Sequence, residues 1–146
     1  MKITNDKRIY NAACTWSKLN HILELNLNTH PDLIVVEPVC KGFTCELILK
    51  SIITFENHST KDTHSLQKLF LMLNGKTQNI IKESTIEEMK KVNITLTHDK
   101  FLEKLNENAN IFENWRYYYE NDQRTDLGFI NALFNSLVNY ANKLFH

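Results

Sequence analysis

Residues that turn or cross-link a chain are scarce in this sequence. There are only 3 glycines and 2 prolines among 146 residues, so few tight turns are available and long helices are favoured over a strand-rich fold. The cysteines, Cys14, Cys40 and Cys45, are odd in number and contain no CxxC pair, which indicates neither a disulfide framework nor a zinc knuckle. We interpret them as buried, reduced thiols of the kind found in cytosolic proteins.

The sequence also lacks an excess of charge of either sign and any long apolar run. Its net charge is +0, so a nucleic-acid site would have to be a local patch rather than a general electrostatic attraction. Its apolar runs are far too short to span a bilayer, and residues 1–10 lack the apolar core of a signal peptide. We therefore expect a cytoplasmic protein with no membrane partner.

What remains is the composition of one ordinary globular domain. The hydrophobic share of 42% and the charged share of 23% are typical values, and a chain of this length can bury one core without cross-links. Residues 1–146 show no internal repeat, low-complexity segment or composition boundary. We predict a single domain.

Apolar residues recur every three or four positions along most of the chain, which predicts an all-α, up-and-down helical bundle of about five main helices. The last of these helices is apolar over more than one face, so it is either central in the bundle or shared with a second subunit. The expected helices cover residues 6–26, 38–56, 64–73, 78–92 (one or two pieces, with a break near Ser84), a segment from Thr95 or Thr97 to about 115, and 126–146.

Two short segments have their own predictions. The apolar run 33–36 is β-branched, but no partner strand is evident, so we interpret it as an apolar lead-in or an extra helical turn. The pair Asn74-Gly75 predicts a left-handed stop at the end of the third helix.

The greatest concentration of recognition chemistry is the run Trp115-Arg116-Tyr117-Tyr118-Tyr119-Glu120. Arg116 offers a permanent charge and a planar set of donors that suit phosphate or carboxylate, and the tyrosines offer stacking faces with a hydroxyl at the tip. The ordinary alternative for Arg116 is an ion pair with Glu120 or with Glu113.

Three segments in chain order resemble the motifs of HEPN domains, the higher eukaryote and prokaryote nucleotide-binding helical bundles. Residues 43–53 look like the second-helix signature, in which an acidic residue (Glu46) precedes an apolar pair and a lysine (Lys50). Residues 64–70 look like the His-x-Leu-x-x-Leu entry into the third helix, and residues 115–120 look like the Arg-Tyr…Glu motif before the last helix. The resemblance covers roughly residues 39–140 and implies a helical bundle with a polar cleft around the arginine.

The family also implies functions. Many HEPN domains are metal-independent ribonucleases of toxin–antitoxin or anti-phage systems, and others are non-catalytic binding or regulatory modules. The resemblance implies RNA or a nucleotide as ligand, a homodimer, a cognate antitoxin or regulatory protein as partner, and no cofactor. In the ribonuclease members, four to six residues separate the arginine from a following histidine. The corresponding positions after Arg116 hold Asn121, Asp122 and Gln123. Arginine cannot act as a base, so the motif favours a binding site over a catalyst.

Seven positions follow as candidate site residues. If the protein is an enzyme, Arg116 would clamp phosphate while His64 or Glu120 transfers protons. The ordinary alternatives are a His64 that starts a helix and bonds a neighbouring helix, and a solvated Glu120. For Glu46 and Lys50 we favour an exposed i,i+4 pair over a place in the cleft, and no metal site is expected. The candidate binding residues are Arg116, Tyr117, Tyr118, Glu46 and Lys50.

Overall fold

The computed structural model describes residues 4–110 and 127–146, and this part of the chain is all-α with no strand. The observed helices confirm the predicted helical bundle. They are α1 (Asn5–Asn26), α2 (Glu37–Asn57), α3 (Leu66–Met72), α4 (Gly75–Lys90), α5 (His98–Glu107) and α7 (Leu127–Phe145), with a 3-10 turn η1 (Pro31–Val35) between α1 and α2.

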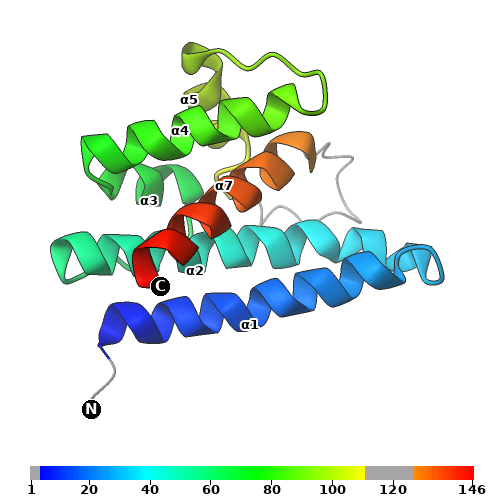
Figure 1. The fold of residues 1–146 in the computed structure, drawn as a ribbon, viewed down its shortest axis with the longest axis horizontal. Helices are drawn as coiled ribbons and strands as arrows, with labels where there is room; N and C mark the ends of the chain where they lie inside the picture. The colour runs from blue at the N-terminus through cyan, green and yellow to red at the C-terminus, as the bar shows by residue number, and fades with distance from the viewer. Residues whose placement is uncertain (1–3, 111–126) are drawn as a thin grey trace.

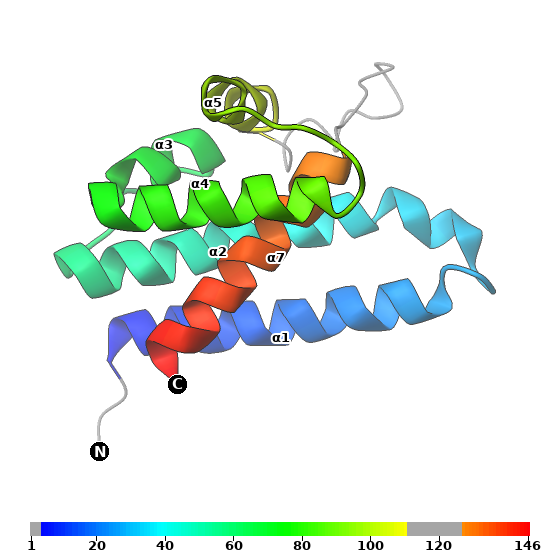
Figure 2. The same ribbon diagram turned by 45° about the horizontal axis from the view of Figure 1, so that its top comes forward.

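Helix α2 packs against α1, α3 and α7. Helices α1 and α2 lie side by side and antiparallel, and α3, α4 and α5 lie on the other side of α2 (Figure 1). Helix α7 crosses this arrangement obliquely and packs against both α2 and α4, as the turned view also shows (Figure 2). Helix α7 is therefore central in the bundle, which is one of the two alternatives that the apolar surface of the last helix left open.

One hydrophobic core connects these elements. Its largest fully buried side chains include Phe70 from α3, Phe101 from α5 and Phe129 from α7. The rings of Phe70 and Phe101 have centroids 5.2 Å apart, and those of Phe101 and Phe129 are 5.8 Å apart, distances at which aromatic pairs attract one another beyond their burial. This chain of rings fixes the short helices α3 and α5 to α7.

The prediction of a left-handed stop at Asn74-Gly75 is wrong. Asn74 is extended, with φ −64° and ψ 157°, and its side chain accepts a hydrogen bond from the backbone N–H of Thr77 at 2.9 Å. Asn74 is thus the N-cap of α4, a position that asparagine favours, and Gly75 is the first helical residue without a positive φ. The same asparagine and glycine chemistry suits either helix end, so the sequence pattern was ambiguous.

Two other helix boundaries differ from expectation. Helix α4 is continuous through Ser84, because the hydroxyl of the buried Thr85 donates to the carbonyl of Ile81 within the helix at 2.8 Å and does not cap a new one. The fifth helix, expected to reach about residue 115, ends at Glu107, where Asn108 folds its side chain back onto the carbonyl of Lys104 at 2.8 Å. Residues 33–36 take up helical turns rather than a strand, as predicted.

Candidate functional site

Helix α2 buries polar side chains because neighbouring helices cover it on several sides. Its buried residues include cysteine, threonine and serine side chains and two charged residues, Lys41 and Glu46. A charged group removed from water costs free energy unless it is paired and hydrogen-bonded. The two charged residues of α2 therefore mark the positions where polar partners have to converge.

Glu46 is the first of these positions. Its side chain is only 3% exposed, and its Oε1 atom accepts from Nζ of Lys50 at 2.8 Å and lies 2.9 Å from Nδ1 of His64. Lys50 follows one turn later on α2, and His64 comes from the segment that leads into α3. The structure thus brings together three of the sequence-predicted site residues.

The burial of Glu46 corrects one interpretation and confirms another. The exposed, solvated pair that we favoured for Glu46 and Lys50 is wrong, because α3 and its lead-in cover this side of α2. The i,i+4 contact itself is present. The ordinary interpretation of His64 was that it starts a helix and bonds a neighbouring one. The side chain does bond the neighbouring helix α2 through Glu46, but it does not start a helix, because α3 begins at Leu66.

The contact with Glu46 determines which ring nitrogen of His64 carries a proton. An ionised carboxylate is an acceptor only, so Nδ1 of His64 must donate to it, and in the neutral ring Nε2 is then the unprotonated nitrogen. The His64 side chain is 58% exposed. Within residues 4–110 and 127–146, Nε2 has no hydrogen-bond partner. His64 therefore offers solvent one oriented nitrogen that can accept a proton or, once protonated, donate to an anion.

Two contacts hold the His64 segment in place. The backbone N–H of Leu66 donates to the carbonyl of Ala109 at 2.9 Å, and the Ser65 side chain caps α3 by accepting from the N–H of Lys68 at 3.3 Å. The first contact places the chain that follows α5 beside the His64 segment. The described chain therefore runs towards residue 111 close to this group.

The remaining candidate residues belong to the segment 111–126. Arg116, Tyr117, Tyr118 and Glu120 lie outside the described residues. Their predicted roles stay predictions.

Lys41 is a second buried charge, at a position that none of the sequence motifs indicated. Its Nζ atom lies 2.7 Å from Glu37, 2.8 Å from Glu24 and 2.7 Å from Oδ1 of Asn131, and it stands 5.6 Å from the centre of the Phe134 ring. Burial by itself lowers the pKa of Lys41, but hydrogen bonds to Glu24 and Glu37 and attraction by both carboxylates outweigh it, so the pKa is raised. The three acceptors use the donors of the ammonium group, so the cluster ties α1, α2 and α7 together and leaves nothing for a ligand.

The thiols of α2 are in an apolar setting. Cys40 and Cys45 are buried and free, and burial raises the pKa of Cys45 to about 12 and raises that of Cys40 as well. A thiol with a raised pKa is a poor nucleophile and a poor metal ligand. These cysteines pack as small apolar residues, as predicted for buried thiols.

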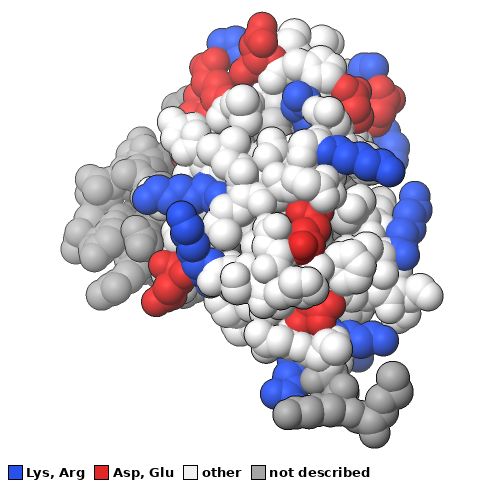
Figure 3. Space-filling view, turned by 90° about the vertical axis from the view of Figure 1, so that its left-hand side faces the viewer, with Lys and Arg blue, Asp and Glu red and all other residues white. Residues whose placement is uncertain are grey.

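The described residues provide neither a metal cluster nor a membrane-crossing element. No group of three or more histidine, cysteine, aspartate or glutamate side chains among them could hold a metal ion. None of their helices is long and apolar enough to cross a bilayer. On the face where α1 begins and α2 ends, acidic and basic side chains are interspersed (Figure 3), so no basic patch forms among the described residues of that face.

Comparisons with protein-family models, with curated proteins and with solved structures found no match in any of the three. The resemblance to HEPN domains therefore rests on the three sequence motifs.

Proposed function

We propose that this protein is an HEPN-like helical bundle that binds RNA or a nucleotide through phosphate, at a site formed by Lys50 and His64 around the buried Glu46. In this proposal Arg116 adds the fixed cation, on the evidence of its sequence motif alone. The biological setting that we propose is a toxin–antitoxin or anti-phage defence system. In such a setting, the cognate partner would be an antitoxin or regulatory protein.

The buried carboxylate of Glu46 is the observation that carries the proposal. Two of the three HEPN-like motifs are 18 residues apart at Glu46 and His64, yet their side chains meet at 2.9 Å. A random pair of weak motifs on a helical bundle has no reason to converge on one carboxylate oxygen. The convergence favours a polar cleft over an accidental resemblance.

The chemistry of the group suits phosphate better than a metal. Glu46 neutralises Lys50 and orients His64, and the remaining N–H donors of Lys50 and, once it is protonated, the exposed Nε2 of His64 can donate to an anion. Lys50 and Glu46 together carry no net charge, so a further cation is needed to attract a phosphodiester. Arg116 would meet that need, and the Ala109 carbonyl that accepts from Leu66 brings the chain before it alongside the His64 segment.

Direct binding measurements test the proposal. We expect fluorescence anisotropy to show binding of a labelled single-stranded RNA that weakens with salt. Lys50→Gln, His64→Asn and Arg116→Ala should each lower affinity about tenfold, the effect of losing one hydrogen bond to a charged group. Asn retains a donor near the Nδ1 position while removing Nε2, so His64→Asn should keep the contact with Glu46. An RNA incubation in the presence of a chelator reports cleavage in the same samples.

The chain offers a matched control for the histidine variant. His98 is also 58% exposed and bonds a carboxylate, Glu83, at 3.0 Å, but that carboxylate is exposed and lies outside the proposed site. His98→Asn and Lys100→Gln should leave RNA affinity unchanged. Wild-type protein that binds neither RNA nor mononucleotides would overturn the proposal. Equal losses in the His64 and His98 variants would overturn the assignment of the site.

A further inference from the structure

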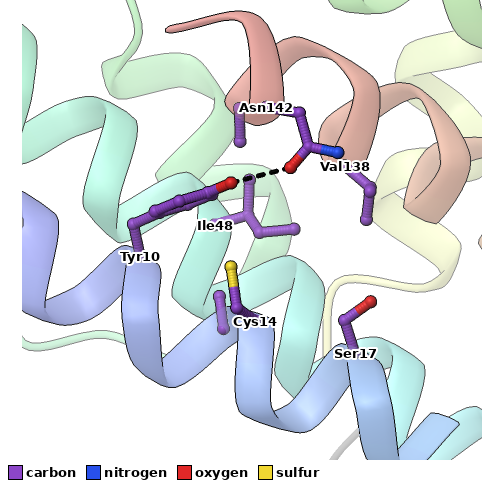
Figure 4. A pocket seen from close by; sticks show the side chains of 8 residues that line it. Tyr10, Cys14, Ser17, Ile48, Val138 and Asn142 are labelled. Carbon is purple, nitrogen blue, oxygen red and sulfur yellow. Dashed lines mark hydrogen bonds between the residues drawn. The ribbon is translucent and has the colours of Figure 1, made fainter. Parts of the chain in front are cut away.

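A crevice of about 120 Å³ lies between α1, α2 and α7, away from the Glu46 group. Its back wall is Ile48, which follows Glu46 by two residues and so points to the opposite side of α2. Figure 4 shows the Tyr10 ring on one side, the Cys14 and Ser17 side chains reaching in from α1, and Asn142 reaching over from α7.

The crevice exists because small side chains face one another across the helix junction. Ala13 of α1 and Ala141 of α7 line it and are buried, whereas Ser17 and Val138 are half-buried and Asn142 is exposed. The space therefore has an apolar floor and a polar rim. No charged side chain lines it.

The hydrogen bonds at the rim determine which polar groups remain available. The hydroxyl of Tyr10 donates to Oδ1 of Asn142 at 2.7 Å. Burial, together with a hydrogen bond and an electrostatic interaction with Cys14, raises the pKa of Tyr10 to about 12, so this hydroxyl stays a donor at neutral pH. Because Oδ1 is held by Tyr10, the Nδ2 amide group of Asn142 points away from that ring (Figure 4).

Two groups are left to meet a ligand. Among the residues that the structure describes, Nδ2 of Asn142 and the hydroxyl of Ser17 have no hydrogen-bond partner. They come from facing walls of the crevice, Asn142 from α7 and Ser17 from α1 (Figure 4). An oxygen that accepts a hydrogen bond could meet either donor, with the apolar body of its molecule on the floor.

We propose that this crevice binds a small uncharged molecule with a compact apolar body and one carbonyl oxygen, which accepts from the amide of Asn142, with Ser17 as the second donor at the rim. The volume sets the size of the ligand, because an apolar cavity of about 150 Å³ accommodates benzene. A five-membered ring that carries a carbonyl group matches the size of the crevice. The absence of charged side chains from the lining excludes ions as preferred ligands, because nothing would offset their desolvation. This site is independent of the proposed phosphate site.

Cyclopentanone is the probe that tests the proposal, with cyclopentane lacking the oxygen and cyclopentylammonium adding a charge. Two-dimensional ¹H–¹⁵N NMR titrations of the full chain should show saturable shifts at residues 10–17, 48 and 138–142 with cyclopentanone. Cyclopentane should bind at least several-fold more weakly, and cyclopentylammonium should not compete. Ser17→Leu, which fills the crevice from its rim, should abolish binding, whereas Thr15→Leu on the exposed side of α1 should not.

Asn142→Asp separates the polar contact from the apolar one. The aspartate keeps an acceptor for the Tyr10 hydroxyl but has no N–H donor, so cyclopentanone affinity should fall several-fold while cyclopentane affinity holds. The proposal is overturned if cyclopentanone causes no saturable shifts, or if its shifts persist unchanged in the folded Ser17→Leu protein. Equal affinity for cyclopentane and cyclopentanone would overturn the assignment of the carbonyl contact.

Discussion

Replacing Lys41 with methionine should destabilise the bundle without altering its helices. Lys41 lies within 2.7–2.8 Å of Glu37, Glu24 and Asn131, and its side chain is only 6% exposed. Methionine keeps a chain of similar length and an apolar stem but has no ammonium group. The substitution leaves the carboxylates of α1 and α2, which now face each other, without their shared cation.

The exposure of each partner sets the size of the effect. The Glu37 side chain is 16% exposed, so its contact counts as a charge-assisted hydrogen bond of about 1.5–3 kcal/mol. The Glu24 side chain is 44% exposed, so solvent screening reduces its contact to at most about 1 kcal/mol. The exposed Asn131 adds a neutral acceptor, and the lower desolvation cost of methionine offsets part of the total. We expect a net loss of about 2–3 kcal/mol.

Thermal and urea unfolding followed by circular dichroism measure this loss. For a chain of this size it corresponds to a fall in Tm of roughly 5–10 °C. Lys90→Met, at an exposed pair with Glu87 on α4, is the matched control and should leave Tm nearly unchanged. A Lys41→Met protein as stable as the wild type would refute the view that the cluster ties three helices together.

The pH dependence gives a second check with a definite sign. The folded pKa of Lys41 is raised, so the folded state holds this proton more tightly than the unfolded chain does. The contribution of Lys41 to stability is complete below its unfolded pKa of about 10.4 and is lost as pH rises through the folded pKa. The difference in stability between wild type and Lys41→Met should therefore stay constant from neutral pH to about pH 9 and shrink above about 10.4.

Three further predictions follow from the described residues. Gly75→Ala should stabilise the protein by about 0.4–1 kcal/mol in urea unfolding, because Gly75 has no positive φ and an added Cβ meets nothing within 4 Å, whereas a left-handed stop would make the same change destabilising. Tyr10 should ionise near pH 12 in a spectrophotometric titration, and the stability it contributes should be complete below about pH 10 and decline towards pH 12, with an ordinary native titration near 10 as the contrary result. Cys14, which is half-buried, should react with a thiol reagent before Cys40 and Cys45, both of which should react only on unfolding, since burial raises their pKa.

The sequence predicted the helices well where apolar spacing was long and regular. The expected helices at residues 6–26 and 38–56 match α1 and α2 to within one residue at each end. A long helix that buries one face in the bundle must place apolar residues every three or four positions, and this regular spacing can be read from the sequence. The all-α class followed for the same reason.

Helix ends were harder to predict because one side chain can serve several backbone geometries. Asn74 caps α4 partly because Glu56, 18 residues earlier on α2, accepts hydrogen bonds from both its backbone N–H and its side-chain amide. No local pattern contains that partner. The early end of α5 likewise depends on the carbonyl of Ala109, which accepts from Leu66 in a different element.

The structure brings together three residues that the sequence indicated, but the sequence misjudged their environment. The sequence indicated Glu46, Lys50 and His64, but spacing along one helix cannot tell whether another segment covers a charged pair. Glu37 and Lys41 have the same i,i+4 spacing as Glu46 and Lys50. In each pair one charged side chain is buried, Lys41 in the first and Glu46 in the second. The useful signal was the surrounding apolar residues on all sides of α2, which predict a helix covered on every face.

The side-chain nitrogens of His64 offer the most direct measurement of the proposed site. A long-range ¹H–¹⁵N NMR spectrum of the imidazole, recorded with and without adenosine monophosphate, separates Nδ1 from Nε2. We expect Nδ1 to keep the signature of a protonated nitrogen bonded to Glu46, while Nε2 shifts with saturation as the nucleotide binds, and His98 should not respond. Saturable nucleotide binding that leaves both His64 nitrogens unmoved, or no binding at all, would contradict the proposal.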